Sequence, residues 1–318
     1  MEHGHTGCRG PSLFPTGLGR EWIPPTSGSA ASPQRTTMLF PHEAHLSATA
    51  YDFLANLVYE RSRIRLGPDR QTLVTGRLRQ RVQALGMADY EEYCDLLKSP
   101  EGEDEVDSLI DLISTNHTHF FREAAHFDIL GERVLPVLAE RAVAAGREMQ
   151  FWCAAAASGE EAYSLAIVLA EFCRSRPGLS WRVYASDISR RMLAACRLGI
   201  YESDKVDLPA PELLARHFQQ GVGEREGYYR VKPELRRHVT TEYVNLFQDS
   251  YPVHRGLDAI FCRNVMIYFD VESRRLLVER LFEQLAPGGY LFVGHSESLL
   301  GLGHRFKAVH PSVYVRPS

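Results

Sequence analysis

Two hydrophobic periods alternate along the second half of the chain, and this alternation limits the fold more than any other feature. Beyond about Arg147, short apolar segments typical of strands are each followed by a segment of helical periodicity. Such alternation predicts an α/β fold, a doubly wound parallel sheet with ligands bound at the carboxyl ends of its strands. The expected strands are 149–155, 182–188, 257–264 and 290–295, the expected helices are 159–173, 189–198 and 271–286, and a turn is expected at 287–289.

Other parts of the chain follow different patterns. Residues 45–115 hold four segments with apolar positions three to four residues apart, which predicts an N-terminal all-α domain. Residues 1–41 contain six glycines and six prolines, so we expect residues 1–44 to be a flexible tail. Residues 116–318 would form the sheet domain, with a small antiparallel β insertion at about 220–247, where β-branched and aromatic residues lack helical period.

The composition excludes several classes of protein. Lys and Arg number 36 against 40 Asp and Glu, so the bulk basic charge of a dedicated nucleic-acid binder is missing. No apolar run approaches the roughly 20 residues needed to span a bilayer, and no signal peptide is apparent, so we expect a cytoplasmic protein. The six cysteines form no C-x-x-C pair, which favours reduced thiols over a zinc site or disulfides.

Two turns at the expected strand ends carry chemistry. Small residues and Gly159 precede Glu160 and Glu161, an arrangement that either admits a ligand or simply places acidic residues at a helix start. Asp187 ends the second strand and could accept hydrogen bonds from ribose hydroxyls or cap the next helix. An acidic turn with a ribose acceptor suits a cationic, phosphate-free nucleoside, and S-adenosylmethionine is such a ligand.

Four longer motifs give these turns a context. They are NHTHFFRE at 116–123, GEEAYSLA at 159–166, FCRNVMIYF at 261–269 and GHSES at 294–298. In this order and spacing they closely resemble the CheR family of chemotaxis protein methyltransferases, and the resemblance covers about residues 45–316. It implies a Rossmann-like class I methyltransferase sheet behind an all-α domain. One departure is Ala162, where many relatives have proline.

The resemblance also implies an activity and a set of site residues. The family transfers the methyl group of S-adenosylmethionine to the γ-carboxylate of glutamates on chemoreceptors, leaving S-adenosylhomocysteine, and no metal is expected. A glutamate is ionised at neutral pH, so the reaction needs proximity and orientation and no general base. Arg122 and Tyr268 are the implied catalytic residues, and whether Arg122 holds the acceptor or the cofactor stays open. The implied cofactor-binding residues are Asn116, Thr118, Arg122, Glu161, Asp187, Asn245, Leu246, Arg263 and Asn264.

The helical domain contains a local basic segment. Residues 61–81 include seven arginines and one acidic residue, Asp69, which is either a solvated face or a partner surface. In the family this domain faces the acidic methylation helices of the receptor, so the resemblance implies that Arg70, Arg77 and Arg81 bind receptor. It also raises docking of a receptor C-terminal tail through the β insertion, which Gln220 leaves open. We expect a monomer that reaches the membrane only through the receptor.

Three alternatives remain on the sequence. An NAD-dependent oxidoreductase lacks support because the first turn has no G-x-G-x-x-G motif. A nucleic-acid methyltransferase would carry an Asn-Pro-Pro-Tyr type loop where this chain has Arg263 and Asn264. A non-catalytic adaptor of the same fold is the third. The His117 and His119 pair has no third ligand nearby in sequence, and we read it as incidental.

Overall fold

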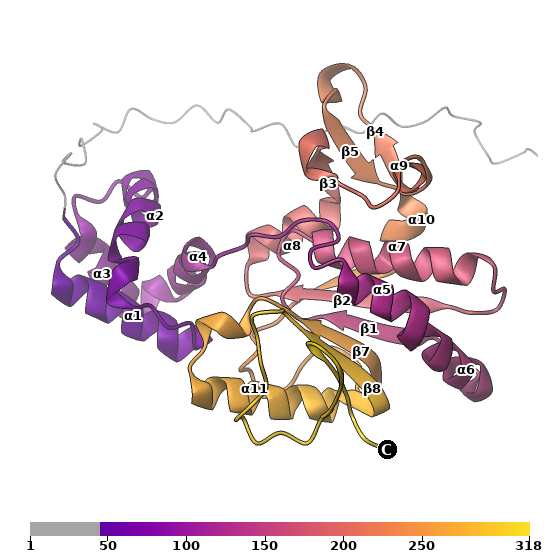
Figure 1. Cartoon of the computed structure of the whole chain (residues 1–318). Helices are drawn as coiled ribbons and strands as arrows, with labels where there is room; N and C mark the ends of the chain where they lie inside the picture. The colour runs from indigo at the N-terminus through magenta and orange to yellow at the C-terminus, as the bar shows by residue number, and fades with distance from the viewer. Residues whose placement is uncertain (1–44) are drawn as a thin grey trace, which may run out of the picture. The chain divides into compact units, whose positions relative to one another are not determined.

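Four helices form the N-terminal domain in the computed structural model, which describes residues 45–318 (Figure 1). They are α1 (Ala48–Ser62), α2 (Gln71–Ala84), α3 (Tyr90–Lys98) and α4 (Glu103–Ile113). The Ser47 hydroxyl caps α1 by accepting from the Ala50 N–H, and the Asp89 carboxylate caps α3 by accepting from the Glu92 N–H. The predicted all-α domain is therefore confirmed, whereas the tail predicted for 1–44 lies outside the described residues.

Seven strands form a mixed, mostly parallel sheet in the order β6-β2-β1-β7-β8-β10-β9, which confirms the predicted fold class. Only β10 runs antiparallel to its neighbours, β8 and β9. The strands are β1 (Met149–Cys153), β2 (Trp181–Asp187), β6 (Val239–Tyr243), β7 (Leu257–Cys262), β8 (Leu285–Val293), β9 (Lys307–His310) and β10 (Val313–Val315). The helices packed with them are α5 (Ala125–Ile129), α6 (Leu135–Ala145), α7 (Glu160–Arg174), α8 (Arg190–Leu198) and α11 (Val271–Gln284).

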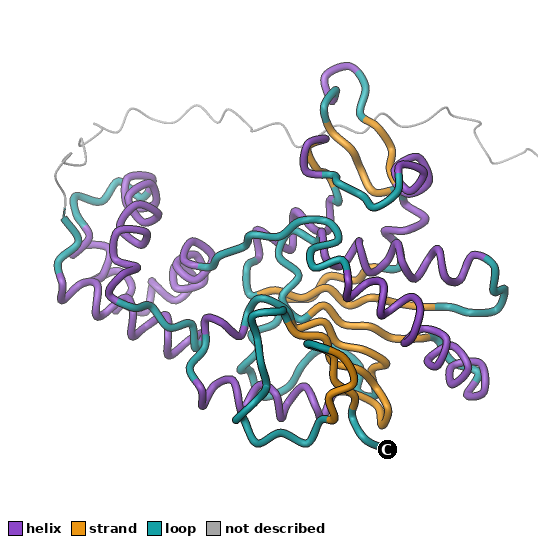
Figure 2. Tube along the Cα trace, viewed as in Figure 1, coloured by secondary structure: helices purple, strands orange, loops and turns teal. Residues whose placement is uncertain are grey.

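Helices cover both faces of this sheet (Figure 2), and the side chains of β1 show why. Successive residues of a strand point to opposite faces. Phe151 and Cys153 enter a core with α6 and α7, whereas Trp152 and Ala154 enter a second core with α11. The strand is apolar at every one of these positions because both of its faces are buried.

A separate three-stranded antiparallel sheet projects from the main one (Figure 1). Its order is β3-β5-β4, and its strands are β3 (Ile200–Glu202), β4 (Phe218–Gln220) and β5 (Tyr228–Val231). The short helices α9 (Pro211–His217) and α10 (Pro233–Arg236) flank it. A small antiparallel insertion was expected, but it begins earlier in the chain than predicted.

Two predicted details are wrong. Segment 238–244 was expected in the insertion, yet β6 pairs in parallel with β2 in the main sheet. Its β-branched residues indicate a strand without indicating the partner strand. The turn expected at 287–289 lies within β8, where a register shift opposite Leu257 absorbs the extra residues. There the Gly288 N–H donates to the Arg316 carbonyl and the Arg316 N–H donates to the Gly289 carbonyl, so the glycines remain hydrogen-bonded.

Within residues 45–318, no helix combines the length and the apolar character required to cross a membrane.

The buried carboxylate of Asp258 ties two strands of the sheet together. It accepts from both Arg147 terminal nitrogens at 2.7 Å and from the Gln150 N–H at 2.8 Å, and the residue is 1% exposed. We predict that Asp258→Ala lowers the free energy of unfolding by about 2–3 kcal/mol, because buried donors lose their acceptor. Urea denaturation followed by circular dichroism measures this. Glu279→Ala, which removes an exposed partner of Arg305, is the control and should cost less than about 1 kcal/mol; equal losses in the two variants would contradict the prediction.

Candidate active site

A pocket that is open to solvent lies at the carboxyl ends of β1, β2 and β7. The segment between α1 and α2 contributes to its lining through Ile64, Arg65 and Arg70. Every residue that the sequence suggested for cofactor binding or catalysis lines this one cavity: Asn116, Thr118, Arg122, Glu161, Asp187, Asn245, Leu246, Arg263, Asn264 and Tyr268. The topology therefore brings residues of the motifs at 116–123, 159–166 and 261–269 together with Asp187, Asn245 and Leu246, at the edge of the sheet where a parallel strand order places ligands.

The turn after β1 is shaped by backbone conformations that few residues adopt. Ala157 has φ +45° and Gly159 has φ +99°. A Cβ on Gly159 would lie 2.5 Å from the Cys196 sulfur, so this position requires glycine on two grounds. The Asp187 carboxylate holds the turn by accepting from the Ala157 N–H at 2.8 Å and from the Ser189 N–H at 2.9 Å. Ser189, and not Asp187, caps α8.

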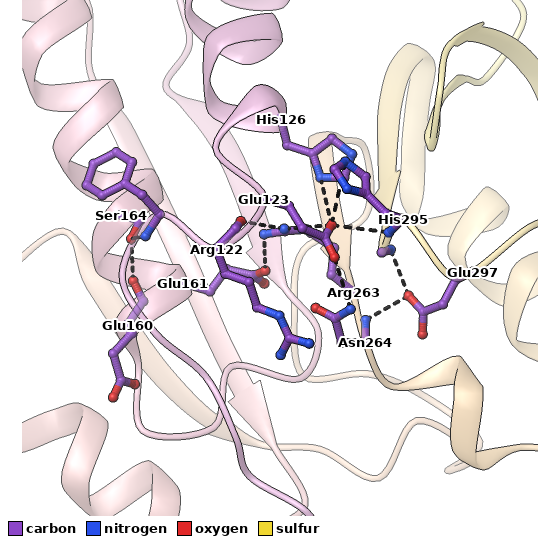
Figure 3. A network of polar contacts seen from close by, with 12 residues as sticks. Arg122, Glu123, His126, Glu160, Glu161, Ser164, Arg263, Asn264, His295 and Glu297 are labelled. Carbon is purple, nitrogen blue, oxygen red and sulfur yellow. Dashed lines mark hydrogen bonds and ion pairs between the residues drawn. The ribbon is translucent and has the colours of Figure 1, made fainter. Parts of the chain in front are cut away.

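Arg263 is the centre of a buried ionic network (Figure 3). Its guanidinium donates to Glu161 at 2.7 Å, to Glu123 at 2.9 Å and to the Arg122 carbonyl at 2.6 Å, while its side chain is 0% exposed. These hydrogen bonds occupy the guanidinium within the protein. Arg263 thus fixes a pocket carboxylate and the backbone of the 116–123 loop relative to each other.

The two carboxylates that share Arg263 differ in their protonation equilibria. Burial raises the pKa of Glu161, although the neighbouring guanidinium opposes this effect. Burial also acts on Glu123, but hydrogen bonds from Arg263, from the Asn264 amide and from the His295 N–H outweigh it and lower the pKa of Glu123 to about 2. Glu123 therefore stays ionised, whereas a cationic ligand in the pocket would favour the ionised form of Glu161.

Glu297 organises the loop that follows β7. This carboxylate, 6% exposed, accepts from four backbone N–H groups, those of Gly294, Asn264, Met266 and Ile267, at 2.7 to 3.3 Å. The loop contains Asn264 at φ +57° and leads to Tyr268. The sequence analysis included Glu123 and Glu297 in the motifs at 116–123 and 294–298 but gave neither residue a role. The available signal for each was an acidic residue within a motif.

Arg122 and Tyr268 keep polar groups available to a ligand. One Arg122 nitrogen donates to the His117 carbonyl at 2.9 Å, and Figure 3 shows its guanidinium directed away from the Arg263 network. Across residues 45–318, the Tyr268 hydroxyl has no hydrogen-bond partner. Both side chains are half-buried and line the pocket, so they are suited to orient a bound group.

Contacts from the helical domain complete the pocket wall. The Arg65 N–H donates to the Tyr268 carbonyl at 2.9 Å, and the Tyr59 hydroxyl donates to Asp270 at 2.6 Å. The Asn245 amide donates to the Arg61 carbonyl at 2.6 Å, while its oxygen accepts from the Phe247 N–H. Both polar atoms of the Asn245 side chain are thus hydrogen-bonded within the protein, and the bond to Arg61 joins the sheet domain to the helical domain.

The three arginines suggested for receptor binding lie in different surroundings. Arg70 is half-buried and lines the pocket. Arg77 lies outside the pocket lining and donates to the carbonyls of residues 112, 113 and 114, at the C-terminus of α4. Arg81 pairs with the buried Glu105, which also accepts from the Tyr93 hydroxyl. Receptor binding by these residues stays a prediction, and two of them also stabilise the helical domain.

The donor set of the pocket identifies the kind of ligand that it fits. Glu161 and Asp187 are buried carboxylates, and a pyrophosphate placed between them would be repelled. Carboxylates suit the ammonium and sulfonium charges and the ribose hydroxyls of S-adenosylmethionine. A doubly wound sheet with this pocket at its strand ends fits an S-adenosylmethionine-dependent methyltransferase.

Comparison with known proteins specifies the class further. Residues 49–114 match the family model described as "CheR methyltransferase, all-alpha domain", and residues 116–315 match "CheR methyltransferase, SAM binding domain". The chain is 38% identical to the chemotaxis protein methyltransferase of Salmonella typhimurium, over 91% of this chain and 96% of that protein. It is 39% identical to that of Escherichia coli, over 85% and 91% of the two chains. This protein belongs to the CheR methyltransferase family.

The hydrogen bonds to Glu297 generate a prediction about cofactor affinity. In Glu297→Gln the new amide nitrogen would face N–H donors, so the loop carrying Asn264 and Tyr268 should lose its fixed position. We expect binding of S-adenosylmethionine to weaken at least about tenfold, equivalent to about 1.4 kcal/mol. Isothermal titration calorimetry measures this. Glu224→Gln, a substitution at an exposed position, should bind S-adenosylmethionine normally. A folded Glu297→Gln protein with unchanged affinity would disprove that Glu297 holds this loop in the position needed for cofactor binding.

The contact of Arg81 generates a prediction about stability. Arg81→Glu places a second carboxylate beside the buried Glu105, and we expect it to lower the free energy of unfolding by about 2–3 kcal/mol. Arg65→Glu, at an exposed position, should change it by less than about 0.5 kcal/mol. Both are measured by urea denaturation. If Arg81→Glu is as stable as the wild type, the Glu105 contact has no structural importance and Arg81 is free to serve receptor binding alone.

Proposed function

We propose that this protein transfers the methyl group of S-adenosylmethionine to the γ-carboxylate of glutamate residues on the cytoplasmic helices of chemoreceptors. The products are a glutamate methyl ester and S-adenosylhomocysteine. The observation that carries the proposal is the composition of one pocket: buried carboxylates suited to a cationic cofactor line it together with Arg65, Arg70 and Arg122, which suit an anionic acceptor. Relatives named chemotaxis protein methyltransferases support the choice of receptor as substrate.

The protein's own residues have separate tasks in this reaction. When bound, S-adenosylmethionine supplies a methyl carbon made electrophilic by the adjoining sulfonium. Glu161 and Asp187 hold the cationic and ribose parts of the cofactor, and Asn116, Thr118, Leu246 and Asn264 complete its surroundings. Arg263 holds Glu161 in place. Most of the rate enhancement then comes from proximity and orientation.

The acceptor carboxylate meets Arg122 and Tyr268. It reaches the pocket already ionised, so no residue has to act as a base. Arg122 steers it by charge-assisted hydrogen bonds, and the Tyr268 hydroxyl, which has no other partner in residues 45–318, donates to one of its oxygens. These contacts direct the second oxygen toward the methyl carbon.

The proposal includes the setting in which the enzyme acts. We propose a cytoplasmic monomer that transfers methyl groups without a metal ion, binds no nucleic acid and meets the membrane only through its receptor. Arg70 and, where their structural contacts allow, Arg77 and Arg81 bind the receptor. A receptor C-terminal tail would dock on the edge of the small antiparallel sheet by strand addition.

Transfer of radiolabelled methyl groups to purified chemoreceptors of the source organism tests the proposal. We expect label in base-labile esters on glutamate, with the rate unchanged by EDTA. Arg122→Ala and Tyr268→Phe should each lower kcat by about 10- to 100-fold. The dissociation constant for S-adenosylmethionine, measured by calorimetry, should stay near that of the wild type.

Each alternative has its own result. Label on a residue other than glutamate would refute the substrate assignment but leave the methyltransferase class intact. A weaker cofactor affinity in Arg122→Ala would assign this residue to the cofactor. Cofactor and receptor binding without any transfer would support the adaptor alternative.

A further inference from the structure

A buried histidine beside the Arg263 network lacks partners that its polarity requires. His126, on α5, is 1% exposed, and among residues 45–318 neither of its ring nitrogens has a hydrogen-bond partner. A buried polar group without a partner costs about 1–3 kcal/mol. A missing ligand for this imidazole is one physical explanation for such a group.

Two further ligand atoms converge on the same point. The Glu123 carboxylate oxygen Oε2 lies 3.4 Å from His126 Nδ1 and 4.0 Å from His295 Nε2. The ligand atoms of the three residues all lie within 4.8 Å of one another. Figure 3 shows the two imidazoles approaching Glu123 from α5 and from the end of β8. In a tetrahedral site with bonds of about 2.0–2.2 Å, neighbouring donor atoms lie about 3.3–3.6 Å apart, so the distance between Glu123 and His126 already fits and His295 has to move closer.

The surroundings allow an ion to enter. The His295 side chain is 51% exposed, which gives it freedom to move and leaves the remaining coordination positions open to solvent. The Arg263 guanidinium, 2.9 Å from Glu123, opposes a second cation. However, Arg263 is shared with Glu161, so its one positive charge faces two carboxylates. The local charge can therefore accept a cation, with an affinity reduced by the guanidinium.

We propose that Glu123, His126 and His295 form a binding site for a divalent transition-metal ion such as Zn²⁺. Two imidazoles and a carboxylate are donors that suit zinc. None of the three residues lines the cofactor pocket, so the site is separate from it. It is also separate from the His117 and His119 pair.

Occupation of this site should act on the cofactor pocket. Glu123 also accepts from Arg263 and from the Asn264 amide, and both of those residues line the pocket. A metal ion would draw the carboxylate away from these partners, so we propose that Zn²⁺ weakens cofactor binding. This second claim rests on the assignment of the pocket to S-adenosylmethionine, whereas metal binding itself does not.

Calorimetric titration of the full-length protein with Zn²⁺ tests the site. The comparison is between the wild type, His295→Ala and the control His310→Ala, which removes a histidine outside the cluster. We expect His295→Ala to bind Zn²⁺ at least about tenfold more weakly than the wild type and His310→Ala to bind normally. Because His3, His5 and Cys8 are present in all three proteins, binding to them cannot produce this difference. His126→Phe, which keeps an aromatic ring against Phe292, should show the same loss if circular dichroism finds it folded.

The opposite results are equally clear. Absence of Zn²⁺ binding, or equal affinity in the wild type and His295→Ala, overturns the site. For the coupling, the affinity for S-adenosylmethionine should fall when Zn²⁺ is added to the wild type and not when it is added to His295→Ala. An unchanged affinity in the wild type overturns the coupling.

Discussion

The burial of one guanidinium, that of Arg263, is the constraint on which the rest of the site depends. A charge with a fully buried side chain is stable only with partners on several sides. Those partners come from two separate segments: Glu161 at the start of α7, and the Arg122 carbonyl and Glu123 carboxylate of the 116–123 loop. Satisfying the charge therefore brings the end of β7, the first turn of α7 and the 116–123 loop into a fixed arrangement, and the cofactor pocket is the space that this arrangement leaves.

Backbone conformation shows where this arrangement is costly. Four residues around the pocket have positive φ angles although none is glycine: Phe121, Glu123, Ala157 and Asn264. All except Ala157 belong to one of the motifs that the sequence analysis identified. Such conformations cost of order 1–3 kcal/mol each and persist only when surrounding contacts enforce them. Here the enforcing contacts are hydrogen bonds to buried carboxylates: Asp187 holds the Ala157 N–H and Glu297 holds the Asn264 N–H. Asp187, which lines the pocket, therefore also fixes the backbone of the turn beside it.

Much of the fold was predictable because strand and helix periods are local properties of the sequence. The expected strands at 149–155 and 182–188 correspond to β1 and β2 to within two residues at each end. Strand partners are non-local, which explains why segment 238–244 was placed in the wrong sheet.

The motifs also predicted which side chains would gather in the pocket. They did not show that Asn245 would be used in joining the domains, that Arg81 would be paired with Glu105, or that Glu297 would bind four backbone groups. Those outcomes depend on distances between segments, which a single sequence does not contain.

The contact between the Arg65 N–H and the Tyr268 carbonyl has a consequence for evolution. Both groups belong to the main chain, so the bond makes no demand on the side chain at position 65, which is exposed. Substitutions there alter the charge and shape presented to an incoming protein, while the tyrosine beside it stays in place. The architecture thereby lets the side chain at position 65 vary without displacing the tyrosine that we propose to orient the acceptor.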